Sequence, residues 1–186
     1  MRNPYIFGFL PFVTVVFFSL TFGVYTVGVS IELFKEIGLY SGMREFLSDI
    51  QLRLSLLVIY ALFFFMVFSA LKLIGETIHN SAMLFFSRDA EGKSFYEARA
   101  GNVIYFFGAI ATAGGIHSIK VMGLLFLLTT ILYFIYTVFK LSKFMSLASM
   151  IGLIAFEVMM WGVLLSVVIY ISLKLYNGVL ASLPII

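Results

Sequence analysis

The sequence predicts an all-α protein: a polytopic transmembrane helical bundle of about five spanning helices, with one short amphipathic helix at the membrane surface. Two observations of composition lead to this prediction, namely 62% hydrophobic residues and only 11% charged residues, with a mean hydropathy of +1.11. A soluble domain carries charge at about a quarter of its positions. The third observation is that the charges fall between long apolar runs. Lipid must therefore surround most of the fold.

Five segments approach the length of a membrane span. A helix needs about 20 apolar residues to cross a hydrocarbon core of ~30 Å. No linker or internal repeat separates the segments, which predicts one integral membrane domain over residues 1–186. Asn177-Gly178 is a helix-stop signal and should end the last span. The expected spans are 6–29, 54–78, 95–117, 121–140 and 147–175.

The third segment is short, because its uncharged part covers only Asn102–Ile116. Ser94 and Glu97 fit a capping box, in which each side chain accepts a hydrogen bond from a free backbone amide at the start of a helix. A helix that begins at Ser94 has enough length to cross the membrane.

A charged segment between the first two spans contains the predicted amphipathic helix. Ser41 is a plausible N-cap, and the apolar residues that follow recur with the i, i+3, i+4, i+7 spacing of one helix face. Such a helix fits a membrane surface. A solvated helical loop is an equally good interpretation, and a partner-binding helix is a third. The apolar face consists of Met43, Phe46, Leu47 and Ile50.

Small residues in the third span predict close helix packing. Gly108 with Thr112, and Ala111 with Gly115, are small-xxx-small pairs that let a neighbouring backbone approach in lipid. The alternative is that Gly114-Gly115 unwinds the helix and exposes carbonyls to an ion, as in broken transporter helices. Packing is the favoured interpretation.

Glu157 is the main candidate functional residue, because it is the one acid near the middle of the last apolar run. An isolated carboxylate inside the bilayer is costly and needs a partner, a proton or a function. Lys72 and Lys120 are expected near helix ends and so cannot pair with it. We therefore expect a neutral Glu157 that donates a hydrogen bond to a hydroxyl or carbonyl of a neighbouring helix.

A structural role and an ion pathway are equally good interpretations of Glu157. A pathway would need further polar groups, and the candidates are Trp161 on the same helix face and hydroxyls of other helices, namely Thr112, Thr129, Thr130 and Tyr133. Lys72 and Glu76 have i, i+4 spacing and are expected to pair. We expect that pair to be an interfacial anchor rather than part of a pathway.

Several functional classes are excluded or disfavoured. The chain has no cysteine and only two histidines, without the spacing of a zinc site, so we expect no metal and no cofactor. Nucleotide-binding loops and hydrolase motifs are absent, and we expect no enzymatic activity. The basic residues flank apolar runs instead of forming a stripe, which excludes nucleic acid as a partner.

Three strings resemble the YufK-like family, small uncharacterised membrane proteins of bacilli. They are Leu39–Phe46 (LYSGMREF), Met66–Ile74 (MVFSALKLI) and Leu173–Asn177 (LKLYN). The resemblance implies a bacterial cytoplasmic-membrane protein, and it provides no activity or site residue that could be transferred.

Flanking cations indicate the orientation. With five spans, seven Lys and Arg residues lie on the side of the amino terminus and five on the other, which predicts a cytoplasmic amino terminus. The favoured function is a non-enzymatic accessory or structural subunit that contacts the lipid bilayer and a membrane-protein partner or further copies of itself. The alternative is a small transporter or channel, perhaps proton-linked, in which Glu157 titrates.

Overall fold

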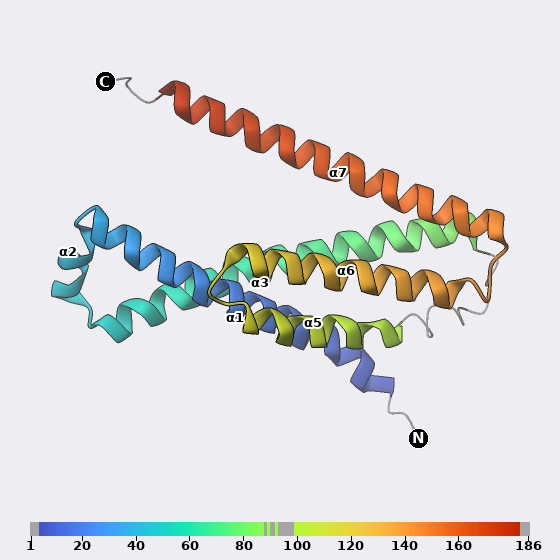
Figure 1. Cartoon of the computed structure of the whole chain (residues 1–186), viewed down its shortest axis with the longest axis horizontal. Coiled ribbons are helices and arrows are strands. Elements are labelled where there is room, and N and C mark those ends of the chain that lie inside the picture. Colours follow the sequence, from blue (N-terminus) through green and yellow to red (C-terminus); the bar gives the residue numbers. More distant parts are fainter. Residues whose placement is uncertain (1–3, 88, 90–91, 93–98, 183–186) are drawn as a thin grey trace.

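The computed structural model describes residues 4–87, 89, 92 and 99–182. All regular secondary structure in these residues is helical, which confirms the predicted fold class. Figure 1 shows long helices that run side by side, with the short α2 at one end. The elements are α1 (Pro4–Glu36), α2 (Leu39–Phe46), α3 (Asp49–Phe86), the 3-10 turn η1 (Arg99–Gly101), α5 (Asn102–Gly114), α6 (Ile119–Leu141) and α7 (Leu147–Ser182).

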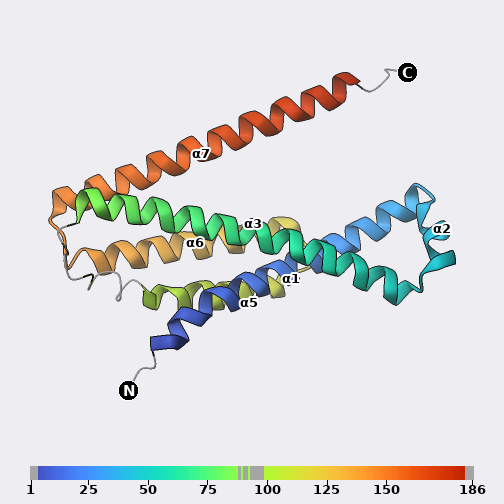
Figure 2. The ribbon, with the colours of Figure 1, turned by 180° about the vertical axis from the view of Figure 1, so that it is seen from behind.

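Helices α1 and α3 form a long pair joined by α2 (Figure 2). Their backbones come close at Gly23, where a Cβ atom would lie 3.2 Å from the backbone nitrogen of Ala61. The helices contain 33 and 38 residues, or roughly 50 and 57 Å at 1.5 Å per residue. Both therefore extend well beyond the spans predicted at 6–29 and 54–78.

The amphipathic helix differs from the prediction. Helix α2 begins after Gly38, whose φ of 75° suits glycine, and it ends at Phe46. Ser48 then starts α3, because its side chain accepts a hydrogen bond from the Gln51 amide while the Gln51 side chain accepts one from the Ser48 amide. This capping box interrupts the predicted helix, and Ser41 is not its N-cap.

The four residues of the predicted apolar face consequently separate. Met43 and Leu47 pack against a cluster of Val27, Ile31 and Leu52 between α1 and α3. The side chains of the other two are exposed: Phe46, at the end of α2, is 86% exposed, and Ile50 belongs to α3. No single helix face carries all four.

Among the described residues, four helices are long and apolar enough to cross a membrane, namely α1, α3, α6 and α7. The shorter α5 has 13 residues and forms a hairpin with α6 through a turn at Gly115. The capping box predicted at Ser94 and Glu97 lies outside the described residues. In the described residues, the 3-10 turn η1 lies directly before α5.

Aromatic residues fill the centre of the bundle. Phe18 of α1 packs against Phe68 of α3 and Phe126 of α6, with ring centroids 5.4 and 5.2 Å apart. Ala109 of α5 is fully buried in the same cluster. These contacts hold four helices together, and α7 contributes no residue to this cluster.

Helix α7 joins the bundle only through its first part. It continues through Asn177 and Gly178 to Ser182, so the predicted stop at those residues is wrong. Figures 1 and 2 both show α7 diverging from the other helices towards its carboxy-terminal end. Every residue from Leu165 to Ser182 is exposed. We call this segment, 165–182, the α7 arm.

Candidate functional site

Glu157 pairs with His79 across the α3–α7 contact. The His79 Nδ1 atom lies 2.7 Å from the Glu157 Oε1 atom, and Glu157 is only 7% exposed. The expected partner was a hydroxyl or carbonyl group, so the imidazole of His79 was not predicted. The reason is that the predicted second span ended at residue 78, whereas α3 continues to Phe86 and carries His79 into the helix contact.

Two glycine–aromatic contacts lie on either side of this pair. A Cβ atom at Gly75 of α3 would lie 3.4 Å from the Trp161 ring of α7, and one at Gly152 of α7 would lie 2.5 Å from the Phe86 ring of α3. Each helix therefore offers a glycine to an aromatic ring of the other. This exchange allows α3 and α7 to approach closely enough for Glu157 to reach the imidazole.

The hydroxyls proposed for a pathway are mostly engaged within their own helices. Thr112, Thr129 and Thr130 donate to backbone carbonyls four residues earlier, at 2.8, 2.7 and 3.0 Å. Tyr105 donates to the Thr130 hydroxyl at 3.2 Å, and its ring packs against Tyr133. These bonds satisfy the threonine hydroxyl protons without forming a chain to Glu157.

Tyr133 lies in the α5–α6 contact, where its ring centroid is 4.9 Å from that of Tyr105. Trp161, also predicted for the site, follows Glu157 by one turn and packs on α3. Trp161 therefore shares the α3–α7 contact with Glu157, whereas Thr129 lies in the α5–α6 contact against Gly108, and Thr112 is buried.

The small residues of α5 pack closely against α6. A Cβ atom at Gly108 would lie 2.2 Å from the Thr129 Oγ1 atom, and one at Gly115 would lie 2.8 Å from the Val121 side chain. Thr112 is fully buried, but Ala111 is exposed. Ala111 differs because it lies on the far side of α5, away from the protein core.

The positions of the charged groups along the bundle can be measured from one buried cluster that three helices share. Ala82 of α3, Leu141 of α6 and Leu153 of α7 form one buried cluster. Lys120 of α6 and Lys174 of α7 each lie about 21 residues from it, or roughly 32 Å at the helical rise. This distance matches the hydrocarbon thickness of a bilayer.

Measured in the same way, Glu157 lies about 6 Å from the cluster. Lys72 lies about 15 Å from it, which is close to half the distance between the cluster and Lys120. Lys72 pairs with Glu76 at 2.5 Å, and their side chains are 38% and 58% exposed. The sequence predicts Glu157 well inside the bilayer and Lys72 near its surface; along the helices, Lys72 lies farther than Glu157 from the buried cluster. The difference arises because α3 continues to Phe86, well past Lys72, whereas α7 begins only ten residues before Glu157.

Comparison with known proteins identifies the family. The model of DUF5366, described as a family of unknown function, matches residues 27–184. The chain belongs to the DUF5366 family. It is 34% identical over 185 residues to the "Uncharacterized membrane protein YufK" of Bacillus subtilis (strain 168), with 100% of both chains covered. No solved structure matches the chain.

The comparison confirms the resemblance to YufK-like proteins. Together with the apolar helices, it shows that this DUF5366 protein is an integral membrane protein. It supplies no activity. The physical chemistry of the side chains must therefore carry any functional proposal for this member of DUF5366.

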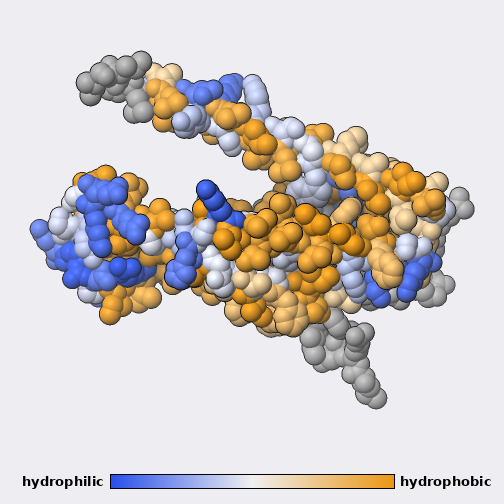
Figure 3. Space-filling model, viewed as in Figure 1, coloured by the Kyte–Doolittle hydropathy of each residue, from blue (hydrophilic) through white to orange (hydrophobic). Residues whose placement is uncertain are grey.

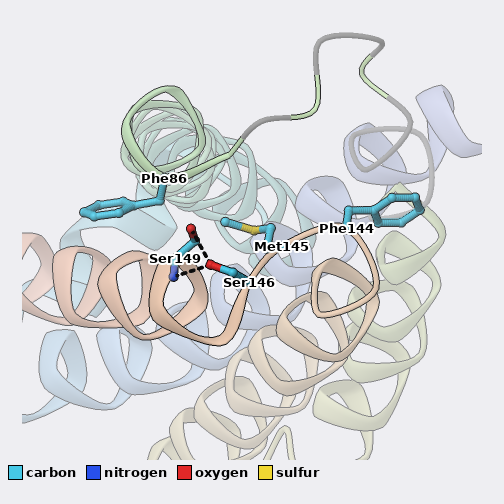
Figure 4. A pocket seen from close by; sticks show the side chains of 5 residues that line it. All are labelled: Phe86, Phe144, Met145, Ser146 and Ser149. Atoms are coloured by element: carbon cyan, nitrogen blue, oxygen red, sulfur yellow. Dashed lines mark hydrogen bonds between the residues drawn. The ribbon is translucent and has the colours of Figure 1, made fainter.

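A small open cavity of about 240 Å³ lies where α3 ends and α7 begins (Figure 4). Its polar lining comes from Ser146 and Ser149. Ser146 accepts a hydrogen bond from the Ser149 amide at 3.2 Å and donates one to the Ser149 hydroxyl at 2.9 Å. These bonds cap the start of α7, so both serines already have a structural role.

A second polar cluster connects α2 to the start of α3. The Tyr40 hydroxyl donates to Asp49 at 2.6 Å, and Asp49 also pairs with Arg53 at 2.9 Å. The hydrogen bond to the Asp49 carboxylate raises the pKa of Tyr40 above its usual value. This cluster fixes the direction of the turn between α1 and α3. Within the described residues, no group of acids and histidines is arranged to hold a metal ion.

Proposed function

We propose that this DUF5366 protein is a non-enzymatic subunit of a membrane assembly, and that the α7 arm is the part that binds a partner. The observation that carries the proposal is the Lys72–Glu76 ion pair, which is half-exposed midway between the two ends of α6. A charged side chain at the centre of a spanning helix costs about 3 kcal/mol on insertion scales. Charges at such a depth usually face protein or water rather than lipid.

The position of α7 supports the same proposal. The His79–Glu157 pair and its flanking glycine contacts hold the first part of α7 against α3. Beyond Leu164, no side chain of α7 is buried against another described residue. Figure 3 shows an open space between the α7 arm and the rest of the molecule. A partner in this space would cover both the arm and the ion pair.

The proposed setting is the bacterial cytoplasmic membrane, crossed several times, with the amino terminus in the cytoplasm. Support for the orientation comes from the larger number of Lys and Arg residues that flank the spans on the amino-terminal side. Without Lys72, which the count of seven includes, six flanking cations lie on the amino-terminal side and five on the other.

Photo-crosslinking in cells of the native host tests the subunit proposal. A benzophenone amino acid replaces Tyr170, an exposed residue of the α7 arm, and in a control it replaces Leu127 on the exposed side of α6. We expect a protein adduct of defined mass from position 170 and only lipid adducts from position 127. Lipid adducts alone at both positions would refute the proposal.

A proton-linked transporter is the second candidate function, and the buried His79–Glu157 pair favours it. Intramembrane pairs of carboxylate and imidazole occur in proton relays, and a histidine changes charge near physiological pH. The test is proton flux into liposomes that contain the purified protein, compared with the Glu157→Gln variant. A flux that is absent, or that Glu157→Gln leaves unchanged, would exclude this function.

A further inference from the structure

Thr137 of α6 differs from every other threonine of the described residues. It is only 5% exposed, and its Oγ1 atom has no hydrogen-bond partner among those residues. The other seven threonines each donate to the backbone carbonyl four residues earlier, as Thr129 does to Leu125 at 2.7 Å. A buried hydroxyl without a partner is destabilising, and such a group usually marks a bound water or another polar partner.

Thr137 lies at the same level of the bundle as the His79–Glu157 pair. It precedes Leu141 by four residues on α6, and Glu157 follows Leu153 by four on α7. Both leucines belong to the buried cluster, so Thr137 and Glu157 each lie about 6 Å from it, on the helix face that carries the leucine. They lie on the same side of the cluster, because α6 ends there and α7 turns back from it (Figure 1).

The Glu157 carboxyl group can accept a further hydrogen bond. Its hydrogen bond with His79 involves the Oε1 atom, and no described side chain bonds to Oε2. The His79 side chain is 24% exposed. The open cavity lined by Ser149 lies two turns of α7 from Glu157, at the end of the bundle where Lys140 flanks α6. Water from this end of the bundle is therefore within reach of the pair.

We propose that one water molecule binds between α6 and α7, where it accepts a hydrogen bond from the Thr137 hydroxyl and donates one to the Glu157 carboxyl group. A buried water is held by about two to four polar partners, and these two side chains supply two. A metal ion fits less well, because no third acid or histidine of the described residues is grouped with the His79–Glu157 pair.

The bound water gives the buried pair a third helix. It connects α6 to the α3–α7 contact and satisfies the Thr137 hydroxyl. It also gives Glu157 a neighbour with which to exchange a proton, as the second candidate function requires. The water does not require the subunit function proposed above.

A double-mutant cycle, measured by reversible unfolding of the full chain in mixed micelles, tests the bound water. Thr137→Val nearly keeps the side-chain shape and removes the hydroxyl. If no water binds, valine replaces an unsatisfied polar group, and the variant should be at least as stable as the natural protein. If the water binds, Thr137→Val should raise the equilibrium constant for unfolding by about three- to tenfold. Most of this rise should vanish in the Glu157→Leu background, where the water has already lost its second partner.

Thr129→Val is the matched control, because Thr129 is another buried threonine of α6 but its hydroxyl bonds within its own helix. Its effect on unfolding should be the same in the natural and the Glu157→Leu backgrounds. Thr137→Ser retains the hydroxyl and should retain the coupling to Glu157. A Thr137→Val variant at least as stable as the natural protein, or one with equal effects in both backgrounds, would overturn the proposal.

Infrared spectroscopy distinguishes a bound water from direct contact between the two side chains. An O–H stretching band of the bound water should shift when the sample is prepared in water that contains the heavy oxygen isotope. The same band should be lost in Thr137→Val and in Glu157→Leu and should persist in Thr129→Val. Coupling between positions 137 and 157 without such a band would show direct contact and refute the bound water.

Discussion

The close contact between α5 and α6 gives the most quantitative prediction. A Cβ atom added at Gly108 would lie 2.2 and 2.3 Å from the γ atoms of Thr129 and 2.8 Å from its Cβ atom. Rotation of the threonine cannot relieve this clash, because the Cβ position is set by the backbone. Gly108→Ala should therefore force the helices apart and lower the free energy of unfolding by about 1–3 kcal/mol, the usual cost of overpacking.

A double-mutant cycle separates this clash from other effects. Thr129→Ala removes both γ atoms and leaves only the 2.8 Å contact, so Gly108→Ala should cost much less in that background. We expect a coupling free energy of about 0.5–2 kcal/mol, within the range for contacting residues. The assay is reversible unfolding in mixed micelles, followed by circular dichroism.

Gly123→Ala on α6 is the matched control, because nothing lies within 4 Å of a Cβ atom there. In this case alanine should stabilise the helix by up to about 1 kcal/mol through its higher helix propensity. If Gly108→Ala proves no less stable than Gly123→Ala, the α5–α6 packing described above is incorrect.

Three further predictions concern the buried pair and the α2 region. Glu157→Leu leaves His79 without its 2.7 Å partner and should lower the free energy of unfolding by about 1–3 kcal/mol. Glu157→Gln keeps a hydrogen bond and should lower it by less. Equal losses of stability in the micelle assay would contradict the pairing. The pKa of Tyr40 is raised by its hydrogen bond to Asp49, so the stability gained from this bond is complete below pH ~10 and falls as the pH rises through the raised pKa. A melting series from pH 8 to 11 should show a steeper loss for the natural protein than for Tyr40→Phe, and parallel curves would refute it. Phe46→Ser should change the free energy of unfolding by less than about 0.5 kcal/mol, because Phe46 is 86% exposed; a larger loss in the same assay would place Phe46 in a core.

Much of the candidate site was beyond prediction from the sequence. Glu157 and Trp161 could be singled out, since a lone acid in an apolar run is unusual whatever its neighbours. His79 could not be assigned as its partner, because the pairing depends on the relative rotation and register of α3 and α7. A helical search for polar residues one turn beyond Glu76 would have marked His79, although not its contact with Glu157.

The ends of the helices were also only partly predictable from the sequence. The apolar runs predicted where helices occur, because lipid obliges each backbone amide to bond within its own helix. They did not predict the ends of α3 and α7, because both helices continue past polar residues: α3 continues beyond His79, where α7 packs against it, and α7 continues through Asn177 and Gly178, where every residue is exposed. The capping box at Ser48, which divides the predicted amphipathic helix, was readable from Ser48 and Gln51 but was outweighed by apolar spacing.

Sequence alone therefore determined that this protein is an integral membrane protein built from apolar helices, since composition decides which solvent the surface can face. Only the tertiary structure decided which charges meet and where they lie along the bundle. Register explains this division: α3 is shifted along α6 and α7, so Lys72 lies about halfway along α6, while Glu157 lies close to the buried cluster of Ala82, Leu141 and Leu153 and beside His79. Hydrophobicity acts residue by residue, whereas register depends on contacts between distant segments such as Gly75 with Trp161 and Gly152 with Phe86.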